Sequence, residues 1–194
     1  GLKVMIDQVL AHCSDQHPWF QESASSRDNP RADWFVWREA KPDGTEPNNW
    51  LSFFGGRAWS WSPKRRQYYH HNFLSSQPNL NYANEAVVSA IVEECRFWLE
   101  RGVDGFRLDA IHTCSTAPHA GDNAARAEKS KSDESGDGSE GDGATQNKGQ
   151  PFAYQLQESA QLDQPGTQTL LRRLRQLSDQ YNDIFLMGEL AGED

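Results

Sequence analysis

The sequence predicts an α/β fold built on a parallel sheet, and two observations support that prediction. First, three apolar runs of strand length occupy residues 3–10, 104–111 and 184–190. Second, a stretch with helical periodicity precedes each of the last two runs. Strands that alternate with helices in this way pair in parallel through right-handed crossovers. Both long connections follow a strand and precede a helix, which is the side where such folds, and TIM barrels above all, place their active sites.

The first predicted strand, residues 3–10, carries Asp7 near its end and has His12 just beyond it. Residues 13–82 then lose all periodicity and contain turn signals such as RDNPRAD and KPDGTEPNN. Short strands such as residues 33–37 fit this stretch. We expect mainly an elaborated loop or a small irregular subdomain, because the stretch is too long for a simple connection.

A helix over residues 84–101 follows, with Asn84 as its N-terminal cap and Gly102 at its end. The apolar face of this helix is expected to contain Val88, Ile91, Val92, Cys95 and Trp98. The second strand, residues 104–111, comes directly after it.

A low-complexity stretch, EKSKSDESGDGSEGDG, lies within residues 113–150, and its Ser, Gly and mixed charges cannot build a core. We expect an exposed, mobile insertion there. Order returns at Pro151, and a second helix is predicted over residues 167–181. One face of that helix should contain Leu170, Leu174, Leu177 and Tyr181. The third strand then occupies residues 184–190.

Composition narrows the function classes. The 194 residues fit one domain, but the chain opens directly into a strand and closes just after another, so we expect a piece of a longer protein. A formal charge of −9 argues against a nucleic-acid partner and is compatible with a neutral substrate. Seven Trp, five Tyr and nine Phe include several in polar surroundings, which suits sugar rings, although buried packing explains most aromatic residues.

The three cysteines, Cys13, Cys95 and Cys114, form no CxxC pair and leave an odd one over. They argue against a zinc site or a disulfide framework and favour a reducing, cytoplasmic compartment. No apolar run reaches membrane-spanning length and no signal-peptide pattern is present, so we expect no membrane partner.

The run GVDGFRLDA, residues 102–110, places two opposite charges inside an apolar strand. Side chains alternate faces along a strand, so Arg107 and Asp109 share one face while Phe106 and Leu108 share the other. A guanidinium beside a carboxylate keeps that carboxylate ionised and holds it in place. Taken alone, this pair fits a structural ion pair as well as it fits a functional site.

Each of the three strands is expected to end in a carboxylate, from Asp7, Asp109 and Glu189, so that a parallel sheet brings all three to one edge. Phe185 and Met187 lie on the same strand face as Glu189 and should raise its pKa, while an arginine partner keeps Asp109 ionised. One protonated acid and one ionised carboxylate are what retaining glycoside hydrolysis requires.

Four short motifs, MIDQVLAH, SSQPNLN, GVDGFRLDA and FLMGEL, resemble in this order the conserved segments of the α-amylase family of glycoside hydrolases. The stretches SDQHPWFQES, SRDNPRADWFVW, PNNWLSFFGG and QYYHHNF are similar to bacterial exo-acting α-glucosidases and oligo-1,6-glucosidases. The resemblance covers most of the chain outside the low-complexity insertion.

The resemblance implies part of a TIM (β/α)8 barrel, strands three to five, that cleaves α-glucosidic bonds in a neutral oligosaccharide or disaccharide without a cofactor. The implied segments, in chain order, are strand three (1–12), an inserted subdomain (13–82), helix and strand four (83–112), the low-complexity insertion (113–150), and the loop, helix and strand five (151–194).

Residue by residue, the resemblance implies that Asp109 is the nucleophile and Glu189 the general acid/base. Arg107 would orient the nucleophile, and Asp7 and His12 would line the pocket around the sugar at the cleaved bond. Without the resemblance, His12 fits an ordinary loop histidine and Asp7 fits a capping or salt-bridged acid.

Four departures from the family pattern matter. Ala11 stands where the amylases carry a calcium-binding Asn, so no metal is expected, and Asn79 replaces a more usual Asp. Ala110, next to the nucleophile, resembles enzymes that prefer α-1,4 links. The family's third catalytic carboxylate, in a His-Asp motif, lies on a later strand that this chain does not contain. We therefore expect the 194-residue chain alone to be inactive and marginally stable, since three strands cannot close a barrel.

Other classes remain open at this point. A transglycosylase or sucrose isomerase would share every catalytic residue seen here, and only product analysis separates it from a hydrolase. A non-catalytic relative, such as the ectodomain of an amino-acid-transporter heavy chain, would keep the barrel and lose the acids. A pure sugar-binding module would explain the aromatic residues but not the paired acids.

Overall fold

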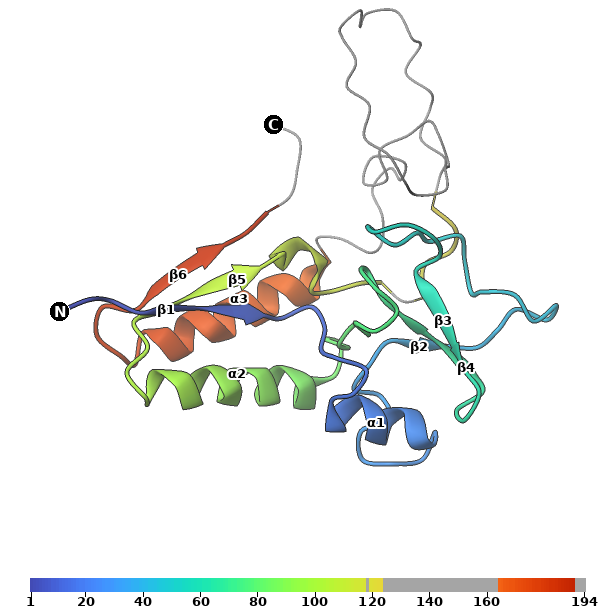
Figure 1. The fold of residues 1–194 in the computed structure, drawn as a ribbon, viewed down its shortest axis with the longest axis horizontal. Helices are drawn as coiled ribbons and strands as arrows, with labels where there is room; N and C mark the ends of the chain where they lie inside the picture. The colour runs from blue at the N-terminus through green and yellow to red at the C-terminus, as the bar shows by residue number, and fades with distance from the viewer. Residues whose placement is uncertain (118, 124–163, 191–194) are drawn as a thin grey trace, which may run out of the picture.

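The computed structural model of the chain describes residues 1–117, 119–123 and 164–190, whose helices and strands form two regions (Figure 1). The parallel region consists of β1 (Met5–Val9), α2 (Glu85–Leu99), β5 (Gly105–Asp109), the short 3-10 helix η1 (Ile111–Thr113), α3 (Pro165–Ser178) and β6 (Phe185–Gly188). The antiparallel region, within residues 13–82, consists of α1 (Pro18–Ser25), β2 (Trp37–Arg38), β3 (Trp59–Ser62) and β4 (Gln67–His70). The whole low-complexity stretch EKSKSDESGDGSEGDG, where we expect a mobile insertion, lies outside the described residues, and so does Pro151, where we expect order to return.

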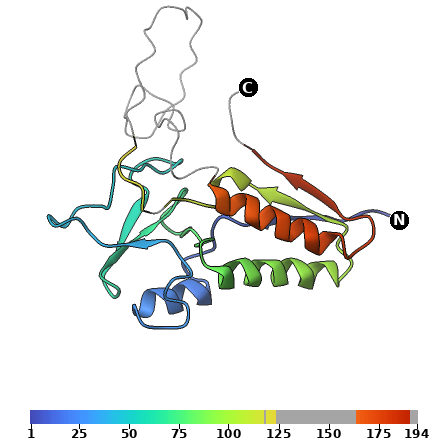
Figure 2. The ribbon, with the colours of Figure 1, turned by 180° about the vertical axis from the view of Figure 1, so that it is seen from behind.

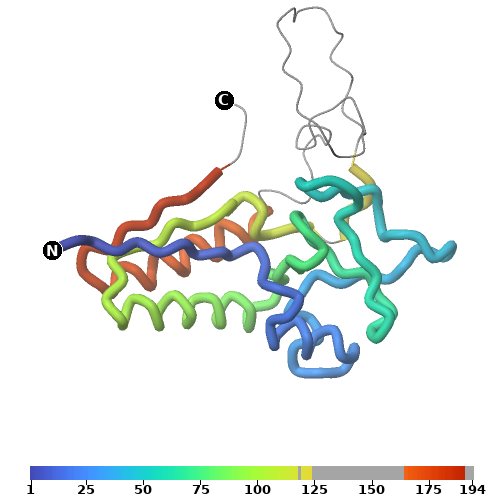
Figure 3. The backbone as a smooth tube through the Cα atoms, viewed as in Figure 1, coloured from blue at the N-terminus to red at the C-terminus, as the bar shows by residue number. Residues whose placement is uncertain are grey.

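The parallel sheet has the order β1-β5-β6, with both pairings parallel as the alternation of strands and helices predicted. The central strand β5 therefore lies between two strands that are far from it in the sequence (Figure 3). Strands β5 and β6 approach closely at Gly105, where a Cβ atom would lie 2.3 Å from the carbonyl oxygen of Phe185. Only glycine fits this position without a shift of the neighbouring backbone.

Helices α2 and α3 lie side by side on one face of the sheet (Figures 1 and 2). Phe106 and Leu108 point to that face and are buried in the core, as the period-two pattern of β5 predicted. Four of the five residues predicted for the buried face of α2 are buried, namely Val88, Ile91, Val92 and Cys95. The fifth prediction, Trp98, is wrong: its side chain is 39% exposed, and Leu99 occupies the core in its place.

The predicted helix boundaries hold to within a few residues. The Asn84 side chain caps α2 by accepting a hydrogen bond from the backbone N–H of Ala86 at 2.9 Å. Gly102 follows that helix with a φ of +86°, the left-handed conformation that glycine adopts readily. Helix α3 begins two residues earlier than predicted because Pro165 occupies its first turn, where a missing N–H costs nothing.

The antiparallel region is more ordered than the sequence predicted. In place of an irregular loop it contains α1 and a sheet with the order β2-β4-β3. Rings of Phe20, Phe35, Trp37 and Tyr69 pack against one another beneath this sheet, with centroids 5.1 to 5.7 Å apart. Strands of two to four residues are too short to show an alternating pattern, and aromatic packing holds them instead.

Buried polar groups join the two regions. The Asn72 side chain donates to the carbonyl oxygen of Thr113 at 3.0 Å, and the Tyr82 hydroxyl donates to the carbonyl oxygen of Leu10 at 2.6 Å. These bonds attach the antiparallel region to the segments that follow β5 and β1. Within the described ranges, none of the helices is both long and apolar enough to cross a membrane.

Candidate active site

The sheet face turned away from α2 and α3 carries Arg107 at the centre of β5. Its Nη1 atom lies 2.5 Å from Asp7 Oδ1 and 3.0 Å from Asp109 Oδ1, and its Nη2 atom lies 2.7 Å from Glu189 Oε2. One guanidinium therefore contacts three carboxylates that come from three neighbouring strands.

The strand register explains this convergence. Asp7 pairs directly with Arg107 across β1 and β5, and Asp109 lies two residues further along the same face of β5. Glu189 is the first residue after β6, whose last residue, Gly188, pairs with Leu108. The expectation that each strand ends in a carboxylate holds for Asp109 and Glu189 but is wrong for Asp7, which lies in the middle of β1.

A tight turn after β5 contributes a main-chain donor. Ala110 has a φ of +41° and a ψ of +47°, a left-handed conformation that costs a non-glycine residue on the order of 1–3 kcal/mol. In this turn its backbone N–H donates to Glu189 Oε2 at 3.3 Å, and the Thr113 hydroxyl donates to its carbonyl oxygen at 2.7 Å. The strained residue thus orients an N–H group toward the carboxylate of the next strand.

The pKa shifts of the two candidate catalytic residues are opposite to those expected, which were a raised pKa for Glu189 and an ionised Asp109. Burial, followed by a hydrogen bond with Glu189, raises the pKa of Asp109. Hydrogen bonds with Asp109, with the Ala110 N–H and with Arg107 lower the pKa of Glu189. The predicted apolar shielding of Glu189 is wrong for the described chain: among its strands β6 pairs with β5 alone, and Phe185 and Met187 are 62% and 40% exposed.

His12 lies three residues beyond β1, and within the described ranges no hydrogen bond or ion pair joins it to Arg107 or to the three carboxylates. Its Nε2 atom is 2.9 Å from Nε2 of Gln77, and its ring meets the Phe73 ring edge-on with centroids 5.3 Å apart. Burial lowers the pKa of His12. Sequence reasoning did not single out Gln77 or Phe73, although Gln77 is part of the SSQPNLN motif.

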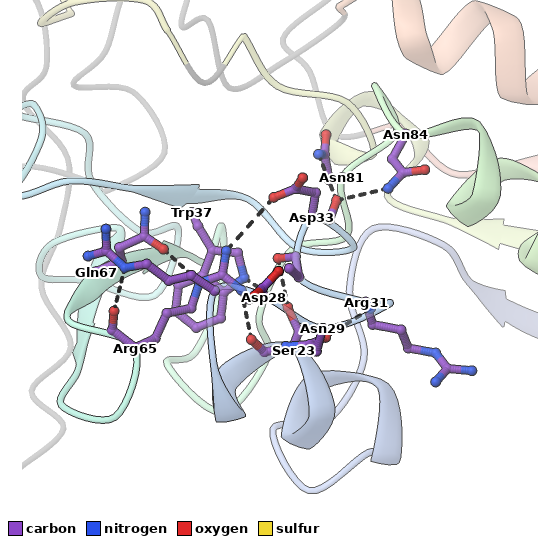
Figure 4. Close-up of polar contacts among 12 residues, drawn as sticks. Ser23, Asp28, Asn29, Arg31, Asp33, Trp37, Arg65, Gln67, Asn81 and Asn84 are labelled. Carbon is purple, nitrogen blue, oxygen red and sulfur yellow. Dashed lines mark hydrogen bonds and ion pairs between the residues drawn. The ribbon is translucent and has the colours of Figure 1, made fainter.

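A cleft of about 510 Å³ lies elsewhere, between the antiparallel region and the start of α2. Trp37 and Asp33 line it, but the Trp37 ring already stacks on Phe20 and under the Arg65 guanidinium. Two further lining residues, Asn81 and Asn84, donate their amide groups to the carbonyl oxygen of Asp33 (Figure 4). Because its aromatic and amide groups are engaged in the fold, this cleft offers a ligand less than the charged face of the sheet does.

Within the described residues, no group of three or more His, Cys, Asp and Glu side chains is placed to hold a metal ion. In the carboxylate cluster the Arg107 guanidinium is bonded to all three acids. The arrangement is therefore an arginine-bridged set of acids, in which the carboxyl groups of Asp109 and Glu189 contact one guanidinium at the ends of neighbouring parallel strands.

Comparison with known proteins gives this geometry a context. The family described as "Alpha amylase, catalytic domain" matches residues 1–194. A probable alpha-glucosidase of Rhizobium meliloti (strain 1021) is 47% identical over 191 residues, which are 98% of this chain and 33% of that protein. An oligo-1,6-glucosidase of Heyndrickxia coagulans is 48% identical over 115 residues, 59% of this chain and 21% of that protein.

Among solved structures, that of the alpha-glucosyl transfer enzyme XgtA superposes with a TM-score of 0.85 at 49% identity. The match covers 100% of this chain and 34% of that one. The chain thus spans about a third of the length of the proteins that it matches over its full extent.

Proposed function

Since the chain belongs to the alpha-amylase catalytic-domain family, a TIM-barrel family, we propose that the protein to which it belongs is a retaining glycoside hydrolase of the α-glucosidase type. In this proposal β1, β5 and β6 are the third, fourth and fifth strands of the barrel, and the antiparallel region is its inserted subdomain. The substrate is a neutral oligosaccharide or disaccharide, cleaved at a terminal α-glucosidic bond. Ala110, beside the nucleophile, favours the α-1,4 linkage.

The observation that carries the proposal is the pair of carboxyl groups of Asp109 and Glu189, held by Arg107 at the ends of two neighbouring parallel strands. Asp109 is the nucleophile that forms the glucosyl ester. Glu189 protonates the leaving oxygen and then takes a proton from the attacking water. Asp7 and His12 bind the hydroxyl groups of the sugar at the cleaved bond.

Substrate binding must change the surroundings of the Asp109 and Glu189 carboxyl groups. Retaining enzymes hold their two carboxyl groups about 5–5.5 Å apart, and here both groups contact the same guanidinium, Asp109 at 3.0 Å and Glu189 at 2.7 Å. A sugar that enters between them moves Glu189 away from the groups that lower its pKa. Asp109 keeps Arg107 as its partner. The pKa of Glu189 then rises and this residue holds a proton, which is the state that the first chemical step needs.

The test uses the full-length protein and α-glucosyl fluoride, whose leaving group departs without protonation. Asp109→Gly should lower kcat/KM for maltose and for the fluoride by about 10⁴-fold or more, because the covalent step is lost. Glu189→Ala should spare formation of the ester from the fluoride and slow its hydrolysis. The matched control is Asp104→Asn, which removes a carboxylate just before the opposite end of β5, where it pairs with Lys3 at 2.8 Å.

Azide assigns the two roles by stereochemistry. Azide attacks the glucosyl ester of Glu189→Ala and should give α-glucosyl azide, whereas in Asp109→Gly it displaces fluoride directly and should give β-glucosyl azide. In both cases a C–N bond replaces a bond at the anomeric carbon. Wild-type activity in Asp109→Gly, or inversion at the anomeric carbon by the unmodified protein, would refute the proposal.

Glucosyl transfer is a second candidate function, favoured by the 49% identity to the alpha-glucosyl transfer enzyme XgtA over the whole chain. The glucosyl ester at Asp109 would then react with a sugar hydroxyl instead of water. Product analysis with maltose and with sucrose separates the two activities: free glucose indicates hydrolysis, and longer or isomeric sugars indicate transfer.

A further inference from the structure

The Gln77 side chain meets His12 where the antiparallel region returns to the end of β1. His12 stands opposite Asn79 in an antiparallel bridge, and the backbone N–H of Leu80 donates to the carbonyl oxygen of Ala11 at 3.0 Å. This short ladder fixes the distance between the two segments, and Gln77 Nε2 lies 2.9 Å from His12 Nε2.

A second contact fixes which way the Gln77 amide points. The backbone N–H of Leu74 donates to Gln77 Oε1 at 3.1 Å, and the backbone N–H of Gln77 donates to the carbonyl oxygen of Leu74 at 2.8 Å. The flipped amide would place its NH2 group against the Leu74 N–H, so that two donors would face each other. The NH2 group therefore faces His12.

An amide NH2 group can only donate, so the His12 nitrogen that it contacts has to accept. Nε2 of His12 must then carry no proton, and the proton of the neutral ring lies on Nδ1. Nδ1 itself is buried and has no hydrogen-bond partner among the described residues. Because none of the described residues offers Nδ1 an acceptor that would favour one tautomer, the contact with Gln77 selects it.

We infer that Gln77 is a positioning residue: it holds His12 as the neutral ring protonated on Nδ1, with Nε2 as a hydrogen-bond acceptor at the end of β1. The inference rests on the proposed function, in which His12 contacts the sugar. A sugar hydroxyl that meets Nε2 then donates to it, beside or in place of the Gln77 amide. The opposite tautomer would present a donor at the same point, and a hydroxyl would have to turn around to bind.

Gln77→Glu reverses the polarity of this contact with little change in shape. The carboxylate still accepts from the Leu74 N–H, but it cannot donate to His12, so the ring has to place a proton on Nε2. Gln77→Met removes both contacts. The control is Gln21→Glu in the same region, because the Gln21 amide donates to the carbonyl oxygen of Asp15 at 2.6 Å rather than to a histidine.

Neutron diffraction from deuterated crystals of the full-length protein reads the tautomer directly. We expect deuterium on Nδ1 and none on Nε2 in the wild type, and deuterium on Nε2 in Gln77→Glu. We also expect kcat/KM for maltose to fall about tenfold in Gln77→Glu, as for the loss of one well-formed hydrogen bond, mainly through KM, while Gln21→Glu is unchanged.

Deuterium on Nε2 in the wild type would overturn the inference, as would a Gln77→Glu variant that carries the opposite tautomer and turns over at the wild-type rate. If the protein cleaves no glucoside at all, the proposed function fails, but the neutron map still decides the tautomer.

Discussion

Two arginines, one in each region, differ in what their guanidinium groups bind. Arg107, in the parallel region, bonds to three carboxylates, and its side chain is 31% exposed. Arg65, in the antiparallel region, has a side chain that is only 4% exposed. Its Nη1 atom donates to the carbonyl oxygens of Ser23 and Ser26 at 2.7 and 3.2 Å, and its guanidinium lies 4.4 Å from the centre of the Trp37 ring (Figure 4).

The opposite pKa directions of the two side chains follow from these partners. Burial among neutral acceptors lowers the pKa of Arg65, because its nearest carboxylate, that of Asp33, is 3.8 Å away and exposed. Hydrogen bonds to Asp7 and Glu189 raise the pKa of Arg107. Arg65 stabilises the fold by donating hydrogen bonds to buried carbonyl groups. Arg107 is surrounded by three carboxylates, which is more negative charge than one guanidinium can balance. Such an arrangement is typical of a functional site and less so of a purely structural one.

Of the changes that test the contrast between the two arginines, replacing Arg107 is expected to have the largest effect. Arg107→Met removes the positive charge that holds Asp109 and Glu189 in position, and kcat/KM should fall about 10²–10³-fold in the full-length protein. The free energy of unfolding should change only slightly, because the Arg107 side chain is partly exposed and its loss does not open a core cavity.

Steady-state kinetics with maltose and urea denaturation measure the two quantities. Arg96→Met is the matched control, since that arginine pairs with Glu93 on the surface of α2. An Arg107→Met variant within tenfold of wild-type activity would show that the contrast between the two arginines has no catalytic meaning.

Replacing Arg65 should give the reverse pattern. Arg65→Met leaves the carbonyl oxygens of Ser23 and Ser26 without their donor and removes the stacking on Trp37, so the free energy of unfolding should fall by about 2–4 kcal/mol. Activity per folded molecule should stay within about twofold. Urea denaturation followed by tryptophan fluorescence, with active-site titration of the folded fraction, separates these effects. A loss of kcat without a loss of stability would contradict the structural role assigned to Arg65.

The sequence alone identifies the charged side chains on the sheet face, because side chains alternate between the two faces of a strand with a fixed period. Alternation along the strand places Arg107 and Asp109 on one face, and parallel pairing brings Glu189 beside them. Similarly, the apolar spacing of α2 predicts most of its buried face. Trp98 is the exception, since a ring at the margin of an apolar stripe can face either the core or the solvent.

The acidity order, by contrast, depends on contacts that no sequence pattern records. The Ala110 N–H that lowers the pKa of Glu189 belongs to the backbone of a strained turn, and any residue other than proline at that position carries the same group. The exposure of Phe185 and Met187 depends on which strands pair with β6, and among the described strands only β5 does. The Gln77–His12 contact likewise comes from packing between segments distant in the sequence.

The smallest expected effect is a difference in Tm between Asp109→Asn and the wild type. The dependence of this difference on pH tests whether the pKa of Asp109 is raised in the folded protein. The pKa of Asp109 is raised in the folded protein. Ionisation of Asp109 therefore destabilises the wild type as pH rises from about 4, the pKa in the unfolded chain, through the higher pKa of the folded protein. Asp109→Asn lacks this titration and can still donate a hydrogen bond to Glu189. Its Tm should therefore match that of the wild type near pH 3 and exceed it by a few degrees at pH 7.

Differential scanning calorimetry between pH 3 and pH 7 measures this difference, with Asp104→Asn as the control. Hydrogen bonds with Lys3 and the Val4 N–H lower the pKa of Asp104, so that carboxylate stabilises the fold above about pH 4 and its removal should lower Tm at pH 7. If Asp109→Asn instead lost stability as pH rose, Asp109 would behave as an ordinary salt-bridged acid. The raised pKa would then be refuted, and Arg107 would outweigh both burial and the neighbouring Glu189.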